Sequence, residues 1–162
     1  SNRFGTGKPA MRSLIAAALF GALAATPAIA RQDVALESSV YVERTSYTGD
    51  GRIIRRIEPA SRLVRGDKVV LVLEWSGDRD AEGFAVTSPI PATLSFRQSG
   101  REGEQVSVDG GSSWCELGDL RIREGGETRH ASAADVTHVR WRITSREAAQ
   151  GTGRIAYSAF VR

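Results

Sequence analysis

The feature that most limits what this chain can fold into is an alternation of apolar and polar residues with a period of two. In HVRWRIT, Val139, Trp141 and Ile143 alternate with polar residues, and similar alternation recurs over residues 34–42 and 155–161. Successive side chains of a β-strand project to opposite faces, so this pattern is typical of half-buried strands. Beyond residue 30, helical periodicity is confined to a short stretch, SREAAQ.

Turn signals separate eight or nine such segments. VVLVLEW, residues 69–75, is apolar on both faces, which predicts a central strand. Pro89 and Pro91 indicate an edge strand or a switch between sheets. The chain is therefore predicted to be all-β, an immunoglobulin-like β-sandwich of about eight or nine strands that forms a single domain over residues 31–162.

The first 30 residues are predicted to be a removable leader. A positive start at Arg12, a short apolar run and small residues up to Ala30 are typical of a secretory signal peptide, here residues 11–30. A transmembrane helix is the competing hypothesis, but it needs about 20 apolar residues, and Pro27 interrupts this run. No stable transmembrane span is expected. Residues 1–10 are interpreted as upstream translated sequence or an expression scar.

Removal of the predicted leader would change the net charge of the chain. Its three basic residues leave with it, so the predicted mature chain carries 19 basic and 19 acidic residues. A neutral domain gives no electrostatic support for nucleic acid as a partner. One local basic run remains, which indicates either contact with anionic polysaccharide or lipid headgroups or, preferably, protection of an edge strand from unwanted pairing; it consists of Arg52, Arg55, Arg56, Arg62, Arg65 and Lys68.

The segment VSVDGGSSW predicts a structural hairpin. Gly110 and Gly111 tolerate the positive φ that tight connections need, and Asp109 can bond its own backbone two residues on. Trp114 can fold over the turn and shield it. These roles account for the residue types without a substrate.

Read from Ser107, the same segment resembles the Asp-box hairpin of sialidase propellers. That resemblance implies a glycan-cleaving enzyme only where several boxes, an arginine cluster and an activated nucleophile occur together. The chain has one box, and the predicted mature chain is too short for a propeller of four-stranded blades. We therefore expect no enzymatic activity, no catalytic residue and no cofactor.

A second resemblance rests on the order of five segments: SRLVRGDKVVLVLEW, VTSPIPATLSF, VSVDGGSSW, DVTHVRWRI and GTGRIAYSAFV. In this order, residues 60–162 resemble the conserved-repeat domain of bacterial surface proteins, the domain of unknown function numbered eleven. The sequence departs from that pattern at Arg65, where proline is frequent, and at residues 76–78, where an Asn-Gly turn is usual. The resemblance implies an immunoglobulin-like sandwich of exported and cell-surface proteins, here as one module.

Other chemistry is weakly indicated. His130 and His138 lie in polar positions without metal-ligand spacing, so no metal site is expected. The acidic loop GDRDAEG is interpreted as a solvated turn in preference to a calcium site. Cys115, the single cysteine, is expected to be buried beside Trp114; an intermolecular disulfide is the second hypothesis.

Two functions stay open. The first is an exported structural or interaction module of the bacterial envelope, at the cell surface or in the periplasm, with itself or a larger envelope protein as partner and with a surface-fibre subunit as one form. The N-terminal segment could complete a neighbouring sandwich by strand addition, or could equally be the domain's own first strand; its apolar face consists of Val34, Leu36, Val40 and Val42. The second is a module that binds a glycan or another ligand near Trp75, Trp114 or Trp141, although Trp75 and Trp141 are expected in the core.

Overall fold

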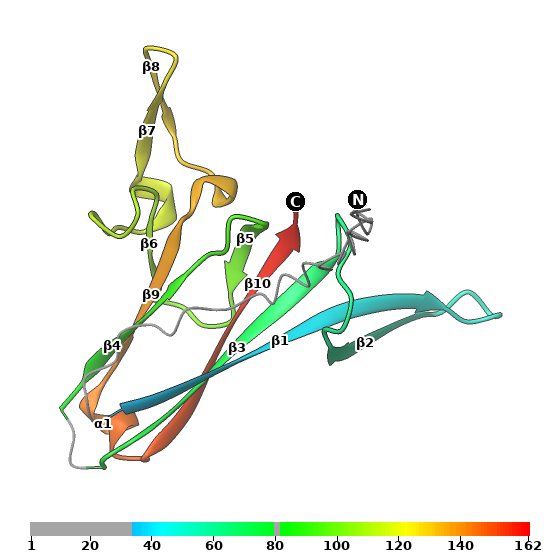
Figure 1. The fold of residues 1–162 in the computed structure, drawn as a ribbon, viewed down its shortest axis with the longest axis horizontal. Coiled ribbons are helices and arrows are strands. Elements are labelled where there is room, and N and C mark those ends of the chain that lie inside the picture. The colour runs from blue at the N-terminus through cyan, green and yellow to red at the C-terminus, as the bar shows by residue number, and fades with distance from the viewer. Residues whose placement is uncertain (1–33, 80–81) are drawn as a thin grey trace, which may run out of the picture.

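A computed structural model describes residues 34–79 and 82–162 (Figure 1). The predicted leader, residues 11–30, and the preceding residues 1–10 lie outside the described residues. The described part contains ten strands, all paired antiparallel, and three short helical segments. The all-β prediction is confirmed.

Two sheets form the body of the molecule. The larger has the order β2-β1-β3-β10-β5 and the smaller β4-β9-β6. The larger sheet comprises β1 (Val34–Tyr47), β2 (Ile53–Pro59), β3 (Lys68–Gly77), β5 (Leu94–Ser99) and β10 (Thr152–Val161). The smaller comprises β4 (Phe84–Pro89), β6 (Gln105–Ser107) and β9 (His138–Ile143). A separate hairpin joins β7 (Arg121–Glu124) to β8 (Glu127–His130).

The core lies between the two sheets. Alternate residues of β3, β9 and β10 supply most of it, as the period-two patterns of β9 and β10 predict, and Trp75 and Trp141 are both buried there. The indole N–H of Trp141 donates to Ser99 Oγ at 2.9 Å. Its ring lies 5.9 Å from that of Tyr157, whose pKa is raised by burial. The expectation that Trp75 and Trp141 belong to the core is confirmed.

Two local features indicated by the sequence are present in the structure: a switch between sheets at Pro89 and a short helix in SREAAQ. The chain changes sheets after Pro89, because β4 is an edge of the smaller sheet and β5 an edge of the larger one. SREAAQ forms the short helix α1 (Ser145–Ala148), for which Thr144 provides the N-cap and Glu147 completes a capping box. At Gly153 a Cβ would lie 2.5 Å from the Trp75 ring, so that close approach requires glycine.

Two hairpin arms extend from the body (Figure 1). The β1–β2 arm, residues 44–59, continues the larger sheet beyond the last β1 residue that pairs with β3, Glu43. The β7–β8 arm, residues 121–130, rises from the loop after η1 (Leu117–Asp119) and returns to η2 (Ala133–Asp135).

Candidate interaction surface

The β1–β2 arm is exposed throughout its second strand. All seven residues of β2 are exposed, and beyond Glu43 the only neighbour of β1 in the sheet is β2. The arm begins as the continuation of a core strand, since Val42 is buried. Gly51, with φ 81°, and the Thr48 and Asp50 side chains form the turn at its tip. The arm therefore presents an edge strand that no described residue covers.

Apolar side chains gather on one face of this arm. Tyr47 and Ile53 lie opposite each other in the β1–β2 register and are 74% and 56% exposed. Ile57, on the same face, is 60% exposed. Exposed apolar residues scattered singly are normal, whereas several on one face of an arm are typical of an interaction surface.

The backbone of β2 also has a free side. Ala60 N–H donates to Val40 C=O, and Arg52 C=O accepts from Thr48 N–H, so even-numbered residues of β2 direct their backbone groups towards β1. The odd-numbered residues Ile53, Arg55 and Ile57 consequently direct N–H and C=O away from the sheet. Pro59, which lacks an N–H, stands on that same free side, where proline is tolerated.

The basic run divides into fixed and free charges. Arg44, at the root of the arm, donates to Asp67 at 2.7 Å and lies 3.5 Å from Glu58. Glu43 accepts from Lys68 at 2.9 Å and lies 4.0 Å from Arg55. Of the run itself, Arg52 pairs with Asp50, whereas Arg56, Arg62 and Arg65 form no ion pair with any described residue.

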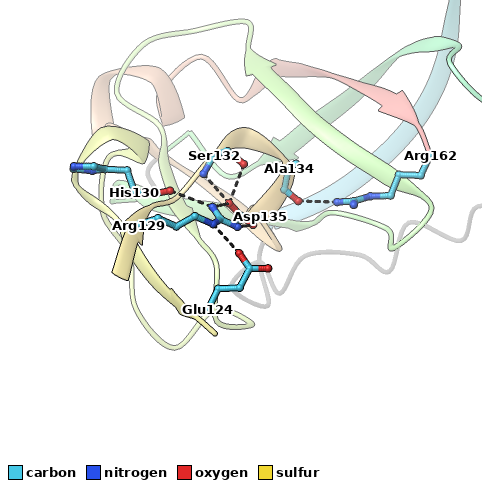
Figure 2. A network of polar contacts seen from close by, with 7 residues as sticks. All are labelled: Glu124, Arg129, His130, Ser132, Ala134, Asp135 and Arg162. Atoms are coloured by element: carbon cyan, nitrogen blue, oxygen red, sulfur yellow. Dashed lines mark hydrogen bonds and ion pairs between the residues drawn. The ribbon is translucent and has the colours of Figure 1, made fainter. Parts of the chain in front are cut away.

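The β7–β8 arm is fixed by polar contacts at its root, shown in Figure 2. Arg129 forms a two-point contact with Asp135, at 2.8 and 3.0 Å, and its Nε donates to Glu124 at 2.8 Å. Asp135 also accepts from the N–H and the hydroxyl of Ser132. The Arg129 guanidinium, together with the Ser132 donors, holds the pKa of Asp135 well below its ordinary value. Arg162 ties the same turn to the body through Ala134 C=O at 2.7 Å.

The Asp109 hairpin is built around one carboxylate. Its oxygens accept from the Ser113 hydroxyl at 2.6 Å, the Ser107 hydroxyl at 2.7 Å and the N–H groups of Ser112 and Ser113 at 3.0 and 2.9 Å. These donors, the Ser113 hydroxyl first, lower the pKa of Asp109 well below 3.8. Gly110 and Gly111 have φ of 77° and 94°. The carboxylate is fully occupied within the turn.

Trp114 folds back over that turn. Its indole N–H donates to Gly111 C=O at 3.0 Å, and the Arg140 guanidinium lies 4.3 Å from its ring centroid. Gln105 orients Arg140 through a 2.6 Å hydrogen bond. A hollow of about 390 Å³ lies beside these residues; it is lined by Ala85, Gly103, Glu104, Gln105, Glu116, Arg140 and Arg142.

Cys115 is exposed, so the expectation that it is buried beside Trp114 is wrong. Among the described residues, Cys115 pairs only with Val106 of β6, in an isolated bridge that continues into no longer ladder. Because β6 is an edge of the smaller sheet, no further strand covers the residue. The Cys115 thiol is accessible, as an intermolecular disulfide requires, but the structure indicates no partner for it. That hypothesis stays a prediction.

The N-terminal segment pairs within its own chain. Val34, Leu36, Val40 and Val42 lie in β1, which is hydrogen-bonded to β3 from Val34 to Glu43. Of the two alternatives open from the sequence, the structure has this segment as the domain's own strand.

The described residues contain no group of three or more His, Cys, Asp and Glu side chains that could hold a metal ion. His138 lies beside Trp114, with ring centroids 6.4 Å apart, and His130 is exposed on β8. Over residues 34–79 and 82–162, no helix has the length and apolar character needed to cross a membrane.

Sequence reasoning missed strand β8 and the Arg129 network. ETRH contains no apolar residue, so strand β8 shows no alternation. The sequence signal for β8 was the Gly125-Gly126 pair between two charged segments. Both glycines have a positive φ in the structure. The addition of β8 raises the strand number from the predicted eight or nine to ten.

The chain was also compared with known proteins. No family model, no curated protein and no solved structure matches it. The resemblance to the conserved-repeat domain of bacterial surface proteins therefore stays a prediction.

Proposed function

We propose that this chain is an exported, non-enzymatic interaction module of the bacterial cell envelope, which binds another polypeptide through the free edge of β2. The observation that carries this proposal is the exposed β2 strand. Ile53, Arg55 and Ile57 direct their N–H and C=O groups outward, and both isoleucines are more than half exposed. An open edge of this kind is where strand addition occurs.

The arrangement of β1 changes how such addition would work. The N-terminal segment would have to leave β3, with which it pairs over ten residues, before it could serve a neighbouring domain. Addition at β2 requires no strand to be released. We therefore assign the contact to β2 and not to the segment that contains Val34 and Leu36.

A second function is favoured by one observation. Of the three tryptophans, only Trp114 is partly exposed, and Arg140, whose guanidinium lies over its ring, also lines the hollow of about 390 Å³ together with Arg142. A glycan or another polar ligand would contact this face. The Arg140 guanidinium already covers the Trp114 ring, however, which lowers the capacity of that ring to stack on a sugar.

The test is photo-cross-linking in the cells that produce the protein. A photoreactive amino acid at Ile53 should give a covalent adduct of higher mass, because that side chain is at the proposed contact. The matched control places it at Glu127, which is also an exposed strand residue and belongs to the other arm. Adducts at Glu127 but none at Ile53 or Ile57 would contradict the proposal, and binding of soluble glycans that is lost in Arg142→Ala would favour the second function.

A further inference from the structure

The free edge of β2 also specifies a partner, and this inference rests on the proposed function. We propose that β2 pairs with β2 of a second copy of this chain, antiparallel, across a two-fold axis at Ile57. The two larger sheets would then form one continuous intermolecular sheet, an isologous contact in which both copies use the same residues.

The two-fold axis must pass through a residue of β2. Directly opposite residues of an antiparallel pair project to the same face of the sheet, whereas successive residues of one strand project to opposite faces. Only residues separated by an even number can therefore face each other. Within Ile53–Pro59, axes at Arg55, Arg56 or Ile57 keep at least five residues of each strand paired.

Charge selects among these three axes. An axis at Arg55 or at Arg56 places that arginine directly opposite its own copy, and like charges in this position are unfavourable. The axis at Ile57 places Arg56 opposite Glu58 of the second copy, and Glu58 opposite Arg56. It also places the exposed Ile57 side chains against each other. This is the only one of the three registers in which opposite charges meet and no like charges do.

The backbone fits the same register. Ile57 directs its N–H and C=O outward and can exchange both hydrogen bonds with Ile57 of the second copy. Arg55 N–H can donate to Pro59 C=O of the second copy, and this contact does not need the N–H that proline lacks. The proline therefore ends the ladder and does not block it.

The ion pairs within each chain leave the necessary groups available. Arg56 has no ion pair with a described residue, and Glu58 contacts only Arg44, at 3.5 Å. Because Arg44 also holds Asp67 at 2.7 Å, Glu58 can turn to Arg56 of the second copy without leaving Arg44 unpaired. A contact of two strands is small, so we expect the dimer to depend on protein concentration.

The experiment is a charge-exchange series on the full chain, measured by size-exclusion chromatography with light scattering over a range of concentrations. The unchanged protein should dimerise. Arg56→Glu and Glu58→Arg each place like charges opposite each other at two symmetric positions, so each should weaken the dimer at least roughly tenfold. The double variant restores both opposite pairs and should dimerise again, and circular dichroism should show all four proteins folded.

A second variant tests the axis itself. In a Cys115→Ser background, Ile57→Cys places two thiols opposite each other with Cα atoms about 5.5 Å apart, within the range of disulfides, and oxidation should yield a covalent dimer. Ile53→Cys is the matched control on the same face. Its two copies would lie about 26 Å apart across the axis, at 3.3 Å per residue, and should not link.

An unchanged protein that stays monomeric, a double variant that does not regain the dimer, or equal linkage at Ile53 and Ile57 would each overturn this inference. The photo-cross-linking experiment distinguishes a failure of this inference from a failure of the proposed function. Monomeric protein whose Ile53 cross-links to a chain of another mass overturns the second copy alone, whereas no adduct on β2 overturns the proposed function as well.

Discussion

The β1–β2 arm and the β7–β8 arm are both antiparallel hairpins that extend from the sandwich, but they are rooted differently (Figure 1). The β1–β2 arm continues a strand whose Val42 is buried in the core. The β7–β8 arm lies between two 3₁₀ turns and is held by Arg129, Glu124 and Asp135. The first hairpin continues a strand held by apolar packing and leaves Arg56 without an ion pair among the described residues, whereas the second is held in place by the charges of Arg129 and Asp135.

The largest expected effect concerns the apolar root. Val42→Ala removes two buried methyl groups and should lower the free energy of unfolding by about 2 kcal/mol, because transfer and cavity terms add. The measurement is urea denaturation, in which the midpoint should fall while the slope m is unchanged. Tyr47→Ala, on the exposed end of the same strand, is the control and should change stability by less than about 0.5 kcal/mol. Equal losses of stability in Val42→Ala and Tyr47→Ala would contradict the view that the arm is anchored at the buried Val42 and contributes little at its exposed end.

The polar root should respond locally. Asp135→Ala removes the acceptor of Arg129 and of Ser132, so hydrogen exchange of the amides in β7 and β8 should accelerate about fivefold, as expected for the loss of a capping side chain worth about 1 kcal/mol. The amides of β3 should not change. Glu124→Ala, which leaves the contact between Arg129 and Asp135 intact, should give a smaller acceleration. Acceleration in β3 would mean that the arm and the body unfold together.

Acid should remove the stabilisation that the Asp109 carboxylate gives to its hairpin. The pKa of Asp109 is lowered in the folded state, so the carboxylate stabilises the fold at neutral pH, and this stability is lost as the pH falls from 3.8 towards the lower folded-state pKa. Asp109→Asn should already lack it at pH 7. Chemical denaturation of the two proteins at several pH values should therefore give curves that converge in acid; a constant difference would contradict the assignment.

The smallest effect is expected at the Trp114 ring. Arg140→Ala removes the guanidinium 4.3 Å from the ring centroid and should cost about 0.5–1 kcal/mol, the range of an exposed cation–π contact. The Trp114 indole resonance should shift in the NMR spectrum. Arg142→Ala, also on β9 but in no ring contact among the described residues, is the matched control and should leave that resonance in place.

The sequence predicted the parts of the fold in which the burial of a side chain depends on its position along its own strand. Trp141 and Val139 alternate with arginines, and Pro89 stops a strand, so the core strands and the sheet switch follow from local patterns. The exposure of Cys115 could not be predicted, because it depends on which strand ends the smaller sheet. The ion pairs of Arg129 likewise require knowledge of where η2 returns.

The position of β10 has a consequence for how the protein is made. This last strand, Thr152–Val161, lies between β3 and β5, and most of its partners are 60 to 90 residues away in sequence. A growing chain that already contains β1 to β9 still has a gap in the middle of its larger sheet. Formation of the larger sheet therefore waits for residues 152–161, and such distant contacts are expected to form slowly. Until then one backbone edge of β3 lacks its partner strand.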